Sequence, residues 1–474
     1  MAENLTLTNT LSHHGLDLNN EEQGEDALRR ETKTPIPFLI EPDPHLCRTI
    51  SSHFSTFSRV SSVASVISQH LYHSDVVVGQ STFCQSVFNS VNVLVGVGIL
   101  ALPLAFRMAG WIMGSIIFLF CTFLTNYTAK LLVRCLEAYR GSTYGDIGAA
   151  AFGDAGRNFV SCVFVIELFT LGVAVVILLG DGLSSLAPQL NPLTINLLCF
   201  AVLTPLLFLP IRKLAYASLI GVISGFSLVI IVVYDGLSKT ERPGSLWEQA
   251  DTELVPSQLY NIPLSFGLIM AGYSGHAVFP SIYRDMEDPR TYSKMIDITY
   301  IITATIYIVM AVAGYAMFGL DTMQEITQNL ALTPGYQKLV NNFAIWLIVL
   351  TPIAKYGLML NPITVTCDLL LESLPRVEAW CKGISWRSSL LQGLVRILLS
   401  ASVIFVAAVF PGFDRIVSLL GALFSFGISA IFPLECYRQL FGSTLSRFES
   451  TMIWTLIVIC SIMAVIGTVA SMIL

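Results

Sequence analysis

Residues 92 to 103 read NVLVGVGILALP and lie within an apolar run that extends from residue 83 to residue 107. A helix of that length can cross roughly 30 Å of hydrocarbon. Gly96, Gly98 and Pro103 nevertheless interrupt it, and an interior glycine costs a helix about 1 kcal/mol. We therefore interpret the run as a membrane-spanning helix that is broken near its middle.

A second apolar run, from 259 to 280, is interrupted in the same way. Its last nine residues read GYSGHAVFP. Two helices broken at mid-membrane would present free N–H and C=O groups to a ligand, as in transporters with an inverted repeat. Small residues spaced four apart, such as Gly110 and Gly114, more simply indicate close helix packing.

The composition of the whole chain also indicates a membrane protein. Of 474 residues, 54% are hydrophobic and 12% charged, whereas soluble proteins carry about 25% charged residues; the mean hydropathy is +0.70. The apolar runs fall at 83–107, 110–136, 158–187, 193–210, 214–235, 259–280, 294–319, 338–361, 393–411, 413–437 and 450–473. The sequence predicts an all-α polytopic membrane protein with eleven transmembrane helices.

Two regions differ in composition. Residues 1–78 are polar, acidic and serine-rich, which predicts a disordered cytosolic tail, and residues 79–474 form the transmembrane domain. With the N-terminus inside, most span-flanking lysines and arginines fall on the cytosolic side, as the positive-inside rule requires. The opposite side holds Arg107, Lys239, Arg242, Lys338 and Arg415. The C-terminus is then expected on the far side.

Three ionisable residues stand well inside predicted spans, namely Glu167, His276 and Lys355. Each costs about 2.5–3.5 kcal/mol at the centre of a bilayer, so each suggests a function. Glu167 and Lys355 lie in the third and eighth spans, equivalent positions of an inverted repeat. Two structural alternatives stay open: a hydrogen-bonding role for Glu167, and an extension of Lys355 toward the cytosolic end of its helix.

Three stretches carry a resemblance to a known family. They are GVGILALPLAF at 96–106, GHAVFPSIYRDMEDP at 275–289 and TPIAKYGLMLNP at 351–362. Together they resemble the amino acid/auxin permease family, and within it the vacuolar amino-acid transporters of plants and fungi. The resemblance covers about residues 80 to 474.

The resemblance implies a fold like that of the bacterial leucine transporter, with a 5+5 inverted repeat and one extra span. It also implies proton-coupled transport of amino acids, which we expect to be neutral, across the vacuolar membrane. The residues expected to line the substrate site are Asn92, Val95, Gly96, Gly98, Ile99, Gly272, Ser274, Gly275 and His276. Lys355, Glu167 and His276 are the candidates for proton coupling.

Other classes of function fit less well. A membrane enzyme would need a catalytic motif such as HExxH or GxSxG, and neither occurs in the sequence. No cofactor, metal site or nucleic-acid partner is expected, and the oligomeric state stays open. A sensor that keeps the site but does not transport, or a carrier of auxin or another amino-acid-like solute, remains an alternative.

Overall fold

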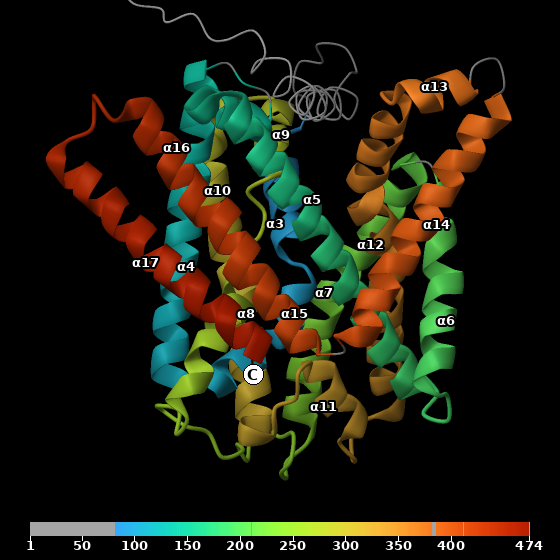
Figure 1. The fold of residues 1–474 in the computed structure, drawn as a ribbon. Coiled ribbons are helices and arrows are strands. Elements are labelled where there is room, and N and C mark those ends of the chain that lie inside the picture. Colours follow the sequence, from blue (N-terminus) through green and yellow to red (C-terminus); the bar gives the residue numbers. More distant parts are fainter. Residues whose placement is uncertain are drawn as a thin grey trace, which may run out of the picture. The chain divides into compact units, whose positions relative to one another are not determined.

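The part of the chain that the structure describes is almost entirely helical. The computed structural model describes residues 81–139, 141, 143–209, 211–381, 385–410 and 412–473 (Figure 1). Within these ranges there is no strand, and the one isolated bridge joins Ser81 to Met286. The predicted all-α class is confirmed, whereas the predicted disordered tail lies outside the described residues.

The helices follow the predicted apolar runs. In chain order they are α3 (Phe83–Leu94), η1 (Val97–Ala101), α4 (Leu102–Tyr139), α5 (Tyr144–Leu186), α6 (Pro192–Leu203), η2 (Thr204–Phe208), α7 (Ile211–Ser238), η3 (Leu259–Asn261), α8 (Ile262–Ala271), α9 (Phe279–Asp285), η4 (Pro289–Thr291), α10 (Tyr292–Phe318), η5 (Gly319–Asp321), α11 (Ile326–Leu332), α12 (Lys338–Glu372), α13 (Pro375–Cys381), α14 (Ser385–Val409), α15 (Phe413–Leu419), the π-helix η6 (Leu420–Ile431), α16 (Phe432–Phe441) and α17 (Arg447–Ile473). Seven described helices are long and apolar enough to cross a membrane, and three shorter ones are apolar. Eleven spans remain a prediction.

Both expected helix breaks are present. The first span stops being helical at Val95, and Gly96 is extended, with φ −121° and ψ −152°, before η1 begins. The sixth span stops at Ala271 and resumes at Phe279, and Pro280 occupies the first turn of α9. Proline suits that position because the first N–H groups of a helix have no partner within it.

The end of the first span and the start of the second lie within the single element α4. Gly110 has φ +69° there, and a Cβ at this residue would lie 2.9 Å from Leu254 O. The N–H groups of the next two residues, Trp111 and Ile112, donate to Glu253 O and Leu254 O. Glycine is required because it alone adopts this conformation readily and leaves room for the loop.

Helix contacts are arranged as an inverted repeat requires. Helix α3 packs on α10, and its counterpart five spans later, α8, packs on α4. The contacts of α5 with α15 and with α14 are matched by those of α12 with α7 and with α6. Figure 1 shows α3 in the upper half of the view and α8 in the lower half. The last apolar helix, α17, packs on α8 and η6.

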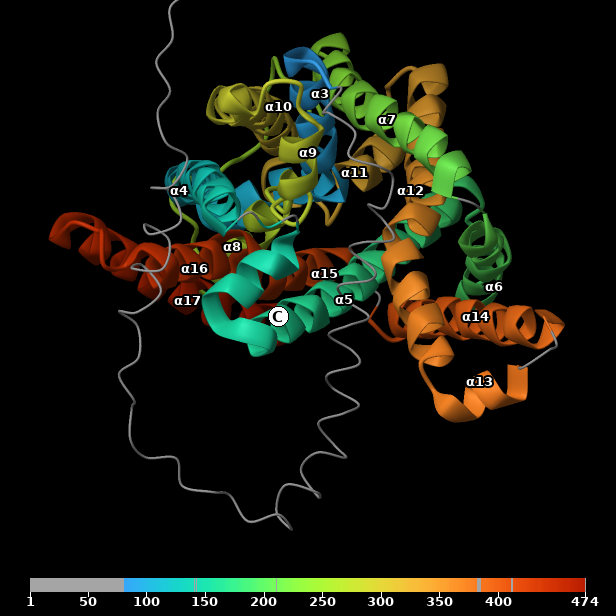
Figure 2. The same ribbon diagram turned by 90° about the horizontal axis from the view of Figure 1, so that it is seen from above.

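The two broken spans lie near the centre of the helix bundle. Seen from above, α6, α12 and α14 lie on one side and α4, α10 and α16 on the other, with α3 and α5 between them (Figure 2). One large buried apolar cluster draws on all of these helices. This packing fixes the positions of the breaks.

A very close helix contact in the core joins α8 to the junction of α15 and η6. A Cβ on Gly421 would lie 1.8 Å from Gly267 O, and one on Gly267 would lie 2.0 Å from Ser418 O. These distances are far below van der Waals contact and involve backbone atoms. Only hydrogen fits at these two positions.

We predict that Gly421→Ala lowers the thermal unfolding midpoint of the purified protein. Overpacking costs about 1–3 kcal/mol, and a backbone neighbour cannot move aside as a side chain can. Gly427→Ala is the matched control, because a Cβ there meets nothing within 4 Å. Equal unfolding temperatures for the two variants would contradict the packing described here.

Candidate functional site

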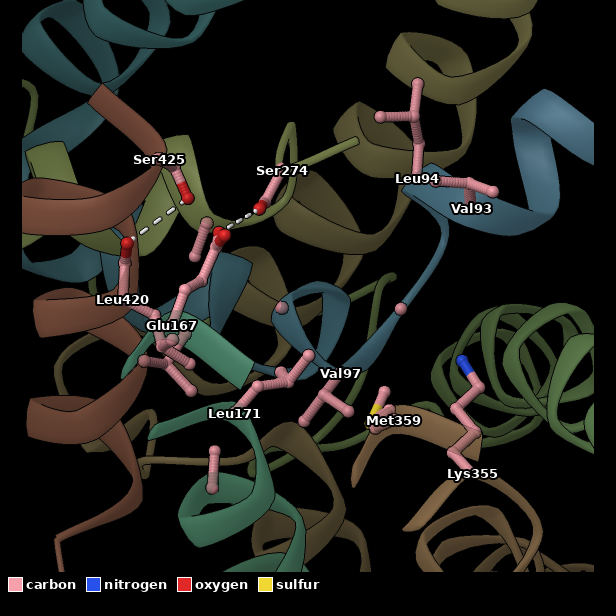
Figure 3. A pocket seen from close by; sticks show the side chains of 15 residues that line it. Val93, Leu94, Val97, Glu167, Leu171, Ser274, Lys355, Met359, Leu420 and Ser425 are labelled. Atoms are coloured by element: carbon pink, nitrogen blue, oxygen red, sulfur yellow. Dashed lines mark hydrogen bonds between the residues drawn. The ribbon is translucent and has the colours of Figure 1, made fainter. Parts of the chain in front are cut away.

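A cavity of about 100 Å³ lies beside the two helix breaks (Figure 3). Its walls come from the first, third, sixth, eighth and tenth predicted spans. The lining residues are Val93, Leu94, Gly96, Val97, Gly98, Glu167, Leu171, Ala174, Ala271, Ser274, Lys355, Met359, Val417, Leu420 and Ser425. A single water needs about 10–15 Å³ measured this way, so the cavity has room for several waters or one small solute.

The two breaks touch each other through backbone. A Cβ on Gly98 would lie 3.1 Å from Gly272 N and 3.2 Å from Gly272 Cα. The hydroxyl of Tyr307, on α10, lies 2.6 Å from Leu94 O and 2.7 Å from Gly272 O. One buried hydroxyl therefore lies within hydrogen-bond distance of a carbonyl from each break, and its single proton is donated to one of them at a time or shared between the two.

Glu167 forms one wall of the cavity. It lies on α5, is 7% exposed, and its Oε1 accepts a hydrogen bond of 2.9 Å from Ser274 Oγ in the sixth-span break. This carboxyl group thus ties the third span to the sixth and also faces the cavity. Its hydrogen bond fits the structural alternative as well as a functional role.

Lys355 lies across the cavity from Glu167. Figure 3 shows Val97 and Met359 between the two side chains. Lys355 is 8% exposed, and a Cβ on Gly221 of α7 would lie 2.6 Å from its Cε. Among the described side chains, no ion pair joins it to Glu167. The cavity therefore has one acidic and one basic group on opposite walls, a pattern that complements a zwitterion.

His276 lies outside this cavity lining. Its Nε2 is 3.0 Å from Thr128 Oγ1, and that hydroxyl is also 2.6 Å from Ser429 O. The imidazole is 1% exposed and joins the sixth span to α4 and to η6. Its expected contact with substrate or proton remains a prediction, and the geometry gives it a place in helix packing.

The other predicted residues divide into two groups. Gly96, Gly98 and Ser274 line the cavity together with Glu167 and Lys355. Outside the lining are Asn92, Val95, Ile99, Gly272 and Gly275. Two of these glycines allow close packing: a Cβ on Gly272 would lie 2.8 Å from Tyr307 Cε2, and one on Gly275 would lie 2.8 Å from Leu94 Cδ2.

Sequence reasoning missed Tyr307 and the cavity residues of the tenth span. Tyr307 is fully buried, and a tyrosine inside an apolar run needs a hydrogen-bond partner for its hydroxyl. That requirement was a usable signal. Val417 and Leu420 had none, because an apolar residue that lines a cavity looks like any other core residue.

The arrangement can bind a small zwitterion. Helix η1 continues directly into α4, so N–H groups at its start are available to an anion such as a carboxylate. The acidic wall at Glu167 faces the cavity and can accept a cationic group. The described residues include no group of three or more histidine, cysteine or acidic side chains that could hold a metal ion.

We predict that Gly98→Val reduces amino-acid uptake by about tenfold or more. A branched side chain would press on the backbone of Gly272, and overpacking of this kind costs about 1–3 kcal/mol. The readout is uptake into proteoliposomes at matched protein content. Gly180→Val is the control, since a Cβ there would meet only Ile195 Cγ2, at 3.7 Å. Normal uptake by Gly98→Val would remove the first break from the site.

Comparison with known proteins identifies the family. The profile described as "Transmembrane amino acid transporter protein" matches residues 79–474. The Arabidopsis thaliana protein "Amino acid transporter AVT1E" is 33% identical over 87% of this chain and 77% of its own length. "Amino acid transporter AVT1B" of the same plant is 32% identical over 94% of this chain and 80% of its own.

A solved structure of a manganese transporter mutant from Eremococcus coleocola is also similar. It shares 16% identity, covers 83% of this chain and 88% of its own, and has a TM-score of 0.45, a likeness that adds nothing to the argument. The family match rests on nearly the whole described region, and the relatives are transporters rather than enzymes. The chain is a multi-pass membrane protein that belongs to the transmembrane amino acid transporter family, the amino acid/auxin permease family that its motifs resemble.

Proposed function

We propose that this chain is a secondary active transporter that carries neutral amino acids, coupled to protons, across the vacuolar membrane. The observation that carries the proposal is the cavity at the two helix breaks, with Glu167 and Lys355 on opposite walls. An amino acid has one carboxylate and one ammonium; the N–H groups at the start of η1 complement the carboxylate and Glu167 complements the ammonium, which leaves Lys355 for the proton.

A preference for neutral substrates follows from the lining. Beyond Glu167 and Lys355, the cavity residues are apolar, glycine or serine. A charged substrate side chain would therefore enter without a fixed counter-charge, which is costly in a site shielded from water. The small volume of about 100 Å³ also favours small substrates.

Proton coupling is supported by where the ionisable groups lie. Glu167 and Lys355 are both nearly buried and both border the cavity. A buried charge is costly in the membrane, so binding of a zwitterion and the gain or loss of a proton are energetically linked. We propose that the ammonium of Lys355 takes the place of a bound sodium ion between the first and eighth spans.

The choice of membrane and orientation rests on the sequence. The motifs resemble the vacuolar branch of the family, and the charge distribution predicts a cytosolic N-terminus and a lumenal C-terminus. The fold is compatible with that distribution. Arg107 bonds Thr322 O and Lys239 bonds Pro334 O, so two predicted lumenal cations meet loops predicted for the same side.

We predict that the reconstituted full chain takes up labelled neutral amino acids in response to a pH gradient without sodium. Acidic and basic amino acids should be transported more slowly, because the cavity lacks a counter-charge for their side chains. The measurement is uptake of a panel of labelled amino acids into proteoliposomes, with and without each ion gradient. Sodium stimulation would contradict the mechanism, and substrate binding without counterflow would favour the sensor alternative.

We predict that Lys355→Ala abolishes pH-driven accumulation but spares exchange of amino acid across equal pH. Loss of the coupling group removes the link to the proton and leaves the substrate contacts of the breaks in place. Glu167→Gln and His276→Ala are tested in parallel, because each is a candidate for the same role.

The matched control is Lys338→Ala, an exposed lysine that begins the same helix. If Lys355→Ala still concentrates substrate in a pH-dependent way, the proton is carried by another residue.

A further inference from the structure

A second cavity lies away from the substrate cavity and shares no lining residue with it. It has a volume of about 690 Å³ and lies at the C-terminal end of α5, beside η5 and the start of α15. Its charged lining residues are Arg107, Asp181, Asp321 and Asp414. We call it the vestibule. It is wide enough to hold water, and acidic groups outnumber basic ones on its walls.

A buried glutamate stands next to this vestibule. Glu325 precedes the first residue of α11 and is 1% exposed. Its Oε2 accepts a hydrogen bond of 3.2 Å from Thr327 Oγ1, while its Oε1 is buried and has no donor among the described residues. A buried carboxylate oxygen without a donor is costly, so its surroundings call for an explanation.

The explanation is a second carboxyl group. Asp181 Oδ2 accepts a hydrogen bond of 3.2 Å from Gln328 Nε2, and Gln328 follows Glu325 by one turn at the start of α11, so the Asp181 carboxyl group lies against the same turn. Two ionised carboxylates have only acceptor atoms. A hydrogen bond between the two carboxyl groups therefore requires that one of them carries a proton.

We propose that Asp181 and Glu325 form a proton-binding site, in which one shared proton joins the end of α5 to α11 at the wall of the vestibule. Asp181 lines the vestibule and so gives the proton a route to water. This site is separate from Glu167, His276 and Lys355, and its existence does not depend on the identity of the substrate.

Electrostatics supports the assignment. Burial and the negative charge of Asp181 raise the pKa of Glu325 well above its ordinary range. Glu325 therefore keeps its proton at pH values below this raised pKa. As pH rises through it the proton leaves, the two carboxylates repel each other, and the contact between α5 and α11 weakens.

The neighbouring charged groups leave the pair without a close counter-ion. Arg107 of α4 donates to Thr322 O, Asp414 of α15 is followed by Arg415, and Asp321 of η5 is exposed. On α12, Asn341 donates to Leu330 O and Lys338 is exposed at the first turn. Helix η1, which also packs against α11, is apolar.

Among the described residues, neither Asp181 nor Glu325 takes part in an ion pair.

Infrared titration of the full chain in liposomes tests the site directly. A protonated carboxyl group has a C=O stretching band distinct from that of a carboxylate, so the pH at which the band disappears reports the proton. The wild-type protein should show such a band, which Glu325→Gln removes. Asp181→Asn should keep the band and move its midpoint to lower pH by about one to three units, because the like charge is gone.

Asp321→Asn is the matched control, since this exposed carboxyl lies in the same vestibule, and it should leave the band unchanged. The inference is overturned if the band persists in Glu325→Gln, or if Asp181→Asn leaves its midpoint unmoved. Should Glu325→Gln fail to fold, the midpoint of Asp181→Asn decides alone. Neither readout requires transport, so failure here is distinguishable from failure of the proposed function.

Discussion

The contact between the two helix breaks is the constraint on which the site depends. Hydrocarbon cannot hydrogen-bond the backbone, so a membrane helix can open only where something else satisfies its carbonyls. In this chain the hydroxyl of Tyr307 lies within 2.6 and 2.7 Å of Leu94 O and Gly272 O. Gly98 lets the two backbones approach closely enough for both carbonyls to share the single proton of this hydroxyl. The breaks are therefore stabilised as a pair.

The contact between the two breaks also determines which ionisable side chains the neighbouring helices bring to the cavity. Because the breaks meet at the centre, α5 and α12, which pack against each other and hold equivalent places in the repeat, both border them. Each brings one ionisable residue to the cavity, Glu167 on α5 and Lys355 on α12. The two charges stay apart instead of forming an ion pair, and a bound zwitterion could satisfy both.

The sequence predicted the helical class and both breaks, because apolar run length, glycine and proline are local signals. It also placed Glu167 and Lys355 in equivalent spans, and both line the cavity. It could not show that His276 faces α4 and η6, because depth along a span says nothing about which face of the helix a residue occupies. Glu325 escaped notice for a related reason: it lies in a loop, where an acidic residue normally faces water, and only the tertiary fold buries it.

Helix α5 connects the substrate cavity to the vestibule. Asp181 follows Glu167 by 181 − 167 = 14 residues, which is about 21 Å along the helix and close to four turns. The two carboxyl groups therefore lie on nearly the same face of α5. The non-helical residue within α5, Gly153, precedes both, so the segment between them is an uninterrupted helix. A shift of α5 caused by proton exchange at Asp181 and Glu325 would then move Glu167 relative to Ser274, its partner in the sixth-span break.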